Sequence, residues 1–186
     1  MLASPSFRPH DALLLVDLQN DFLPGGSLAV AEGDAVLPVL NRWIEAAERA
    51  GTPVIATRDW HPPDHVSFEA QGGPWPPHCV AGTEGAAFHP ALALPDDAVI
   101  VSKATEPEAE AYSGFDGTDL AAMLRELGVR RLWVGGLATD YCVRASALDA
   151  AEAGFEVALI PGGHRGIAES TSDEALRDME AAGVLT

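Results

Sequence analysis

Short apolar runs alternate with longer, mixed segments along this chain. The runs have the length of buried strands, and they cover residues 12–16, 53–57, 98–102, 131–135 and 155–160. The segments between them predict helices at residues 37–50, 119–127, 141–153 and 172–182, of which the first three are closed by Gly51, Gly128 and Gly154. We expect Ser170, Thr171 or Ser172 to cap the last helix, and residues 184–185 to form a short edge strand.

Strands that alternate with helices are typical of a parallel sheet covered on both faces. The pattern therefore predicts an α/β protein with three layers, α/β/α, around a mostly parallel, Rossmann-like sheet of about five to six strands. No internal repeat and no linker divides the sequence, so we expect residues 1–186 to form a single domain. Two irregular stretches, at residues 60–90 and 106–117, interrupt the alternation, and loops this long inside a compact domain usually carry function.

Polar, reactive side chains follow four of the predicted strands. Asp17 ends the first strand, and the second runs into Asp59 and His61. Lys103 ends the third strand, and a glycine turn after the fourth leads to Cys142. In open α/β sheets, ligands bind outside the carboxyl ends of the strands. Any one of these residues alone is more often a surface or capping residue, but together they indicate a reactive site at this edge.

Cys142 stands where a helix is expected to begin. Thr139 or Asp140 can cap that helix, and its first-turn N–H groups and its dipole then favour a thiolate. A free cysteine is otherwise a small buried apolar side chain, and this interpretation fits Cys79, which has no comparable turn around it.

Asp17 and Lys103 supply what a nucleophilic thiol needs. Lys103 is the only lysine of the chain, and a nearby ammonium lowers the pKa of a thiol. Asp17 can take the thiol proton and later return it to a leaving group. An alternative role for Asp17 is that of a turn or cap residue, for which Asp21 is the better candidate.

The first irregular stretch contains a pattern of metal ligands. Asp59, His61 and His65 stand close together in a segment stiffened by prolines, and His78 follows in the same stretch. Carboxylate and imidazole ligands suit one divalent metal ion: zinc, iron or manganese. The prolines exclude a regular helix that would pair His61 with His65. The other three histidines lack such neighbours, and we interpret them as structural: His10, His89 and His164.

Composition narrows the class of partners. The formal net charge of -17 disfavours nucleic acid and anionic membrane surfaces, which attract clustered Lys and Arg. The N-terminal apolar run is short and broken by Asp17, so neither a signal peptide nor a membrane span is expected. Two distant cysteines fit a reduced, cytoplasmic protein. We therefore expect a small-molecule substrate, while the oligomeric state, including a homo-oligomer, stays open.

With these residues in place, the chain resembles the nicotinamidase/pyrazinamidase family of the isochorismatase-like (cysteine hydrolase) superfamily. The matching segments occur in family order and span nearly the whole chain: 16–22 (VDLQNDF), 58–61 (RDWH), 75–82 (WPPHCVAG), 111–115 (AYSGF) and 136–143 (GLATDYCV). The Asp, Lys and Cys alone would indicate only the superfamily. The metal-ligand loop separates nicotinamidases from isochorismatases and related amidases.

The resemblance implies a deamination of nicotinamide to nicotinate and ammonia, with pyrazinamide also accepted, through a thioester on the cysteine. It implies that Cys142 is the nucleophile, Asp17 the general base and acid, and Lys103 the cationic partner. It also implies metal ligation by Asp59, His61 and His78, with His65 as a fourth ligand or a supporting residue. Phe22, Trp75, Ala138 and Tyr141 would contact the substrate, and the N–H groups of Ala138, after a cis bond from Leu137, and of Cys142 would form an oxyanion hole.

Other interpretations stay open at this point. A related amidase or an isochorismatase-type hydrolase for another small substrate would share most of these residues. A non-catalytic domain is disfavoured because Asp17, Lys103 and Cys142 are all present, and a zinc hydrolase would leave Cys142 without a role. The acidic stretch from Glu106 to Glu110 has no role that the sequence alone reveals.

Overall fold

The computed structural model describes residues 5–186, which form five strands and several helices. Along the chain the elements are β1 (Asp11–Val16), η1 (Asn20–Phe22), η2 (Gly33–Val36), α1 (Leu37–Ala50), β2 (Val54–Asp59), η3 (Glu69–Gln71), β3 (Val99–Lys103), α2 (Leu120–Glu126), β4 (Arg131–Leu137), η4 (Thr139–Val143), α3 (Arg144–Glu152), β5 (Glu156–Arg165) and α4 (Glu169–Ala181). The five apolar runs and the four helices predicted between and after them are all present.

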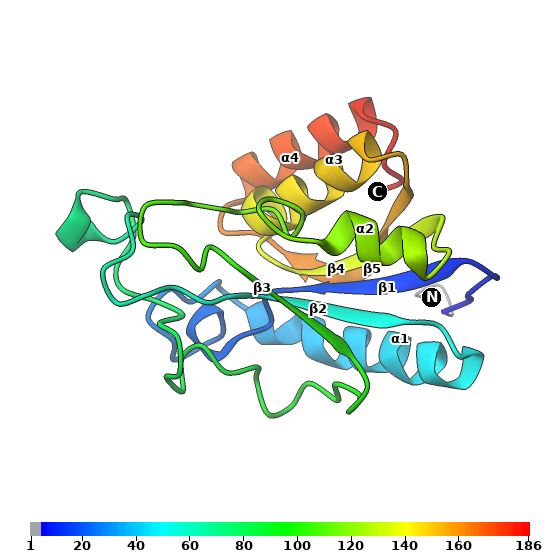
Figure 1. The fold of residues 1–186 in the computed structure, drawn as a ribbon, viewed down its shortest axis with the longest axis horizontal. Coiled ribbons are helices and arrows are strands. Elements are labelled where there is room, and N and C mark those ends of the chain that lie inside the picture. Colours follow the sequence, from blue (N-terminus) through cyan, green and yellow to red (C-terminus); the bar gives the residue numbers. More distant parts are fainter. Residues whose placement is uncertain (1–4) are drawn as a thin grey trace.

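The five strands form one parallel sheet in the order β3-β2-β1-β4-β5. In Figure 1, α1 lies on one side of this sheet, and α2, α3 and α4 lie on the other. The predicted three-layer α/β/α architecture is therefore confirmed. No helix of residues 5–186 combines the length and the apolar character that a membrane crossing requires.

The central strand β1 shows how the sequence produces these layers. Its side chains alternate between the two faces, as they do in any strand. Leu13 and Leu15 belong to the core cluster that includes the apolar face of α1, whereas Leu14 belongs to the cluster that includes residues of α2, α3 and α4. All six residues of β1 are buried, because both faces of the sheet are covered.

The structure corrects several expected boundaries. The helix expected at residues 141–153 begins as a π-helical turn, η4, before it continues as α3. The predicted cap for α4 is wrong, because that helix begins at Glu169 and its N-cap is Ala168, which offers no side-chain hydrogen bond. Leu185 forms only an isolated parallel bridge with Ala158 instead of an edge strand.

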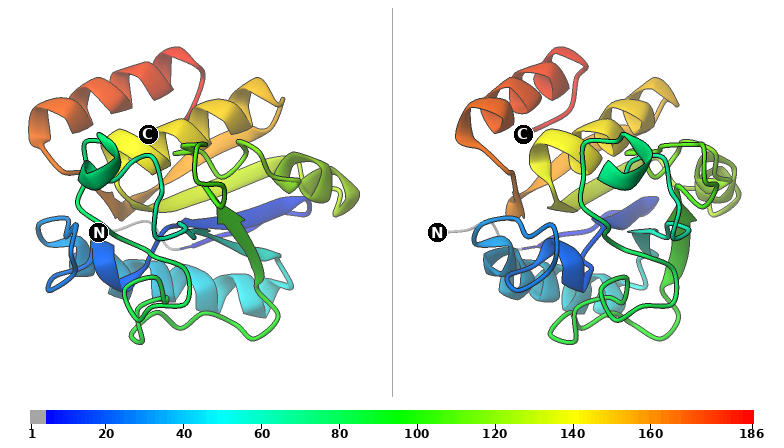
Figure 2. Two further views of the ribbon diagram at one scale, coloured as in Figure 1. Left: turned by 60° about the vertical axis from the view of Figure 1, so that its left-hand side comes forward. Right: turned by 90° about the vertical axis from the view of Figure 1, so that its left-hand side faces the viewer.

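The two irregular stretches gather at the carboxyl edge of the sheet. The segment after β2, which carries η3, projects on the left of Figure 1, and the segment after β3 runs beside it. The right-hand view of Figure 2 looks onto this edge, where the turns after β1 and β4 also lie. The topology thus brings together the positions at which the sequence placed its reactive residues.

Candidate active site

Lys103 lies at the centre of a buried group of charges. Its Nζ is 2.9 Å from Asp17 Oδ2, 2.5 Å from Asp59 Oδ1 and 3.5 Å from Cys142 Sγ. It also donates a hydrogen bond of 3.2 Å to the Ala111 carbonyl. Burial alone would lower the pKa of Lys103, but the two carboxylates raise it well above the usual value. The side chain is therefore a fixed ammonium that the thiol and both carboxylates share.

Asp17 is held at the end of β1 by its neighbour strand. Its N–H donates to the Thr57 carbonyl at 3.2 Å, and its Oδ1 accepts a hydrogen bond of 2.7 Å from Thr57 Oγ1. Burial raises the pKa of Asp17, Lys103 opposes this effect and Asp59 adds to it, so the pKa lies above the usual value for an aspartate. A buried carboxyl with a raised pKa is suited to accept a proton and return it.

Cys142 lies in η4 with its sulfur beside Lys103 and is 6% exposed. Burial raises the pKa of its thiol well above the usual value, Lys103 lowers it in part, and Asp17 and Asp59 raise it further. The expected thiolate at a helix N-terminus is therefore wrong for this arrangement. A thiol with a raised pKa needs a neighbouring base to take its proton before it can act as a nucleophile.

The predicted caps of the cysteine helix are also wrong. The Thr139 hydroxyl is 2.9 Å from His164 Nδ1, so a histidine that the sequence left without a partner supports this turn. Asp140 accepts hydrogen bonds from the start of α4 instead of from its own helix. Both side chains therefore connect the cysteine turn to β5 and α4, which follow it in the chain.

Asp59, His61 and His78 converge on one point. The Nε2 atoms of His61 and His78 lie 3.4 Å and 3.9 Å from Asp59 Oδ2, and one potential ligand atom from each residue lies within 4.8 Å of the others. All three residues are buried. Among residues 5–186, His61 Nε2 finds no hydrogen-bond partner, which is costly for a buried polar atom unless another group occupies the site.

The contacts of the two imidazoles leave the same nitrogen free on each. His61 Nδ1 is 3.2 Å from the Ala104 carbonyl, and His78 Nδ1 is 2.8 Å from the Pro76 carbonyl. A carbonyl only accepts, so each Nδ1 carries the hydrogen and each Nε2 presents a lone pair. Two imidazole nitrogens and a carboxylate oxygen form a donor set that fits a divalent metal ion.

His65 differs from the other two loop histidines. Its Nδ1 is 2.7 Å from Ser67 Oγ and its Nε2 is 3.1 Å from the Ala109 carbonyl, so both ring nitrogens are engaged. Its ring stacks on His61 with centroids 4.1 Å apart. The structure therefore places His65 behind His61, as a support for that ring, and outside the converging donor set.

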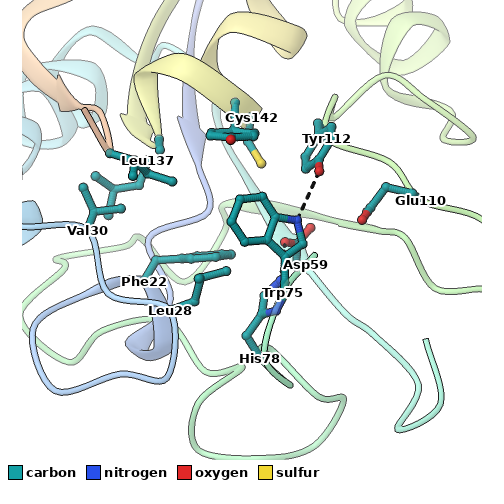
Figure 3. A pocket seen from close by; sticks show the side chains of 13 residues that line it. Phe22, Leu28, Val30, Asp59, Trp75, His78, Glu110, Tyr112, Leu137 and Cys142 are labelled. Carbon is teal, nitrogen blue, oxygen red and sulfur yellow. Dashed lines mark hydrogen bonds and ion pairs between the residues drawn. The ribbon is translucent and has the colours of Figure 1, made fainter. Parts of the chain in front are cut away.

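A pocket opens beside these groups, and Figure 3 shows the Cys142 sulfur pointing toward it. Phe22, Trp75 and Tyr112 stand around the same space in Figure 3, and Trp75 Nε1 donates a hydrogen bond of 3.1 Å to the Tyr112 hydroxyl. The Trp75 ring also meets the Tyr141 ring edge to face, with centroids 5.3 Å apart. The four residues predicted to contact a substrate all line this pocket: Phe22, Trp75, Ala138 and Tyr141.

The chain between β4 and η4 forms the wall next to the sulfur. The peptide bond between Leu137 and Ala138 is cis, as expected for this segment. The Ala138 carbonyl accepts hydrogen bonds of 3.1 Å from the N–H groups of Tyr141 and Val143, which fixes this residue against the turn that carries Cys142.

Gln19 holds Asp59, one of the candidate metal ligands, in place, although the sequence analysis assigned no role to Gln19. Its Nε2 donates to the carbonyls of Asp59 and Ala86 at 2.7 Å and 2.9 Å, and its Oε1 accepts the Asp59 N–H at 2.8 Å. Gln19 belongs to the recognised segment 16–22, but the sequence does not show that its side chain points toward the Asp59 backbone.

One residue of the acidic stretch from Glu106 to Glu110 lies at the pocket. Glu110 lines the pocket together with Tyr112, and the Glu110 carboxylate accepts the Ala111 N–H at 2.9 Å. Tyr112 was part of a recognised segment without an assigned contact. The remaining wall residues, to which the sequence assigned no substrate contact, are aliphatic: Leu28, Val30, Leu137 and Ile167.

A buried thiol beside a carboxylate and an ammonium, at the carboxyl edge of a parallel α/β sheet, is the arrangement of a cysteine-dependent hydrolase. The sequence profile of the Isochorismatase domain matches residues 11–186, and the chain belongs to this family.

Known relatives are similar over nearly the full length. A nicotinamidase of Escherichia coli is 42% identical over 198 aligned residues, which cover 94% of this chain and 93% of that protein. The crystal structure of a Pyrococcus horikoshii pyrazinamidase in complex with zinc is 52% identical, with a TM-score of 0.93 over 95% of this chain and 98% of that one. A Leishmania infantum protein in complex with nicotinate is 36% identical, with a TM-score of 0.87 over 100% and 95% of the chains.

Proposed function

We propose that this protein is a nicotinamidase, which hydrolyses nicotinamide to nicotinate and ammonia and also accepts pyrazinamide. The observation that carries the proposal is the aromatic pocket into which the Cys142 sulfur points, with the Asp59–His61–His78 donor set beside it. The relatives named above support the choice of substrate, because they include a nicotinamidase, a pyrazinamidase and a nicotinate complex.

The reaction begins with proton transfer from the Cys142 thiol to Asp17. The Lys103 ammonium is 3.5 Å from the sulfur and stabilises the thiolate as it forms. The thiolate attacks the carboxamide carbon, and the N–H groups of Ala138 and Cys142 hold the oxyanion. Removing one such donor typically costs about 10²–10³ in rate.

The same carboxyl completes the turnover. Asp17 gives its proton to the departing ammonia when the tetrahedral intermediate collapses to a thioester on Cys142. A water that loses a proton to Asp17 then attacks the thioester, which releases nicotinate and restores the thiol. The raised pKa of Asp17 suits both directions of proton transfer.

Asp59, His61 and His78 would hold one divalent ion: zinc, iron or manganese. Such an ion supplies positive charge that orients a ring nitrogen and polarises the bound substrate. His65 supports His61 from behind and is not a ligand in this proposal. Phe22 and Trp75 enclose the ring, and Tyr141 packs on Trp75 to fix its angle.

Ammonia release from nicotinamide tests the proposal directly. The purified protein is assayed as isolated, after chelation, and after addition of zinc, iron(II) or manganese(II) in separate samples. We expect turnover that falls on chelation and returns with at least one ion. Turnover of isochorismate without ammonia release from nicotinamide would overturn the proposal, and undiminished turnover of the metal-depleted protein would overturn the role of the ion.

A further inference from the structure

The connection between β5 and α4 contributes one residue to the pocket that the proposed mechanism leaves unused. Ile167 lies in this connection, lines the pocket with Cys142 and Tyr141, and is 46% exposed. A half-exposed isoleucine normally has no specific role. The backbone of Ile167, however, is held beside the pocket by hydrogen bonds.

Asp140 is the residue that holds it. The Ile167 N–H donates to Asp140 Oδ1 at 3.0 Å and to Oδ2 at 3.2 Å, and the Ala168 N–H is 3.4 Å from Oδ2. The Thr171 hydroxyl donates to the same Oδ2 at 2.6 Å. Asp140 therefore fixes the chain just before α4, a helix whose N-cap residue is an alanine, and binds the Thr171 side chain in its first turn.

The close approach of the two segments depends on Gly166. A Cβ at this position would lie 1.9 Å from Ser172 Oγ and 3.2 Å from Asp140 Oδ1. A larger residue here would have to displace the Ser172 hydroxyl and would crowd the Asp140 carboxylate. Since Asp140 is two residues before Cys142, the position of Ile167 is fixed relative to the sulfur.

The pocket beside Ile167 has a polar part and an aliphatic part. Its polar groups, such as Asp59 and His78, come from the buried charged cluster and the metal-ligand set, whereas Leu28, Val30 and Leu137 supply aliphatic surface. Ile167 adds to the aliphatic part and retains solvent exposure, which places it at the mouth of the pocket.

We propose that Ile167 is a specificity-determining residue that packs on the ring of bound substrate at the pocket mouth, and that Asp140 is a positioning residue acting through it. The proposal rests on the function given above. The contact is made equally in the ground state and the transition state, because it lies away from the reacting carbon, so it affects KM and leaves kcat nearly unchanged.

The first test measures kcat and KM for nicotinamide with Ile167→Ala. We expect KM to rise about fivefold to tenfold, the effect of a few lost methylene contacts at a half-exposed site, with kcat within about twofold. Leu127→Ala is the matched control, because Leu127 is 49% exposed and lies beside Gly51 and Pro53, at the amino end of β2. It should leave both constants unchanged.

The second test asks whether Asp140 acts through Ile167. Asp140→Ala should raise KM about as much as Ile167→Ala, and Asp140→Asn should recover most of the loss because one oxygen can still accept the Ile167 N–H. In the double variant Asp140→Ala/Ile167→Ala, we expect no further rise in KM. Melting temperatures are recorded for each variant, so that a KM effect is separated from lost stability.

The outcomes separate the two proposals. Absence of ammonia release by the wild type contradicts the proposed function and with it this inference. Wild-type turnover with an unchanged KM in Ile167→Ala contradicts the pocket role of Ile167 alone. An Asp140→Ala effect that persists in full in the Ile167→Ala background contradicts the positioning role of Asp140.

Discussion

Asp59 and Lys103 are register partners across β2 and β3, and Asp59 Oδ1 lies 2.5 Å from the Lys103 ammonium. The other oxygen, Oδ2, faces His61 and His78. Burial would raise the pKa of Asp59, but Lys103 and His61 hold it well below the usual value. The Asp59 carboxylate thus links the candidate metal site to the ammonium beside Cys142. A change in charge at one of these sites therefore alters the electrostatics of the other.

Replacing Asp59 should affect both sites at once. In Asp59→Asn, we expect metal content to fall and kcat/KM for nicotinamide to drop at least about 100-fold, because a ligand and the partner of Lys103 are lost together. Metal analysis and ammonia release measure the two effects. Asp64→Asn, an exposed aspartate in the same loop, is the control and should behave as wild type. Full metal content in Asp59→Asn would contradict the assignment.

The three loop histidines should differ in their effect on metal affinity. His61→Ala and His78→Ala remove a donor atom and should abolish stoichiometric metal at micromolar concentration. His65→Ala removes only the ring stacked on His61, so we expect about a 10–100-fold weaker affinity, as for residues that orient a ligand. Titration of the apo protein with zinc measures this ranking, with the exposed His10→Ala as control. A variant of His65 that loses metal as completely as His61→Ala would make His65 a ligand.

Gln19 should matter for stability as well as for the site. Gln19→Ala removes three buried hydrogen bonds to backbone groups of Asp59 and Ala86, which leaves those groups without partners. We expect the free energy of unfolding to fall by about 2–4 kcal/mol. Denaturant unfolding of the metal-free protein measures this. Asn20→Ala is the control, since Asn20 makes one exposed hydrogen bond to the Glu84 carbonyl and should cost less than about 1 kcal/mol. Equal losses in both variants would refute the special role of Gln19.

The ion pair at the opposite end of β1 predicts a pH-dependent term in stability. Burial would raise the pKa of Asp11, but hydrogen bonds from Arg131 and the Arg8 N–H hold it below the usual value. A lowered folded-state pKa stabilises the protein above the unfolded pKa, about 3.9, and this contribution is lost as pH falls through the folded pKa. Asp11→Asn should cost about 1–3 kcal/mol at pH 7 and progressively less below about pH 4.

Denaturant unfolding at several pH values checks this dependence. Glu45→Gln serves as control, because the Glu45–Arg49 pair is exposed on α1 and contributes little at any pH. A stability difference between wild type and Asp11→Asn that stays constant down to pH 3 would be inconsistent with the lowered pKa.

Much of the site could be predicted from the sequence because strand ends are visible in the hydrophobic pattern. Asp17, Asp59 and Lys103 each end an apolar run, and a parallel sheet necessarily brings such positions to one edge. The resemblance then distinguished His61 and His78 from the other histidines, and their Nε2 atoms indeed converge on Asp59.

Other features depend on contacts that spacing does not encode. Asp140 was predicted as a cap for its own helix, but its carboxylate binds the Ile167 N–H just before α4, which begins 29 residues later in the chain, at Glu169. The contact of His164 was equally hidden in the sequence, because its partner Thr139 lies 25 residues before it. The thiolate expectation for Cys142 is wrong because burial of the sulfur raises the pKa of the thiol and the two nearby carboxylates raise it further, and only the folded chain creates these surroundings.

The central claim is that the Cys142 thiol is the nucleophile. Its most direct test is ammonia release from nicotinamide by metal-loaded wild type, Cys142→Ala and Cys79→Ala, each with its metal content measured. We predict that Cys142→Ala keeps its metal and loses turnover by at least about 10³-fold, whereas Cys79→Ala, which removes the other buried thiol and leaves Cys142 in place, stays active. Turnover by metal-loaded Cys142→Ala at the wild-type rate would contradict the account.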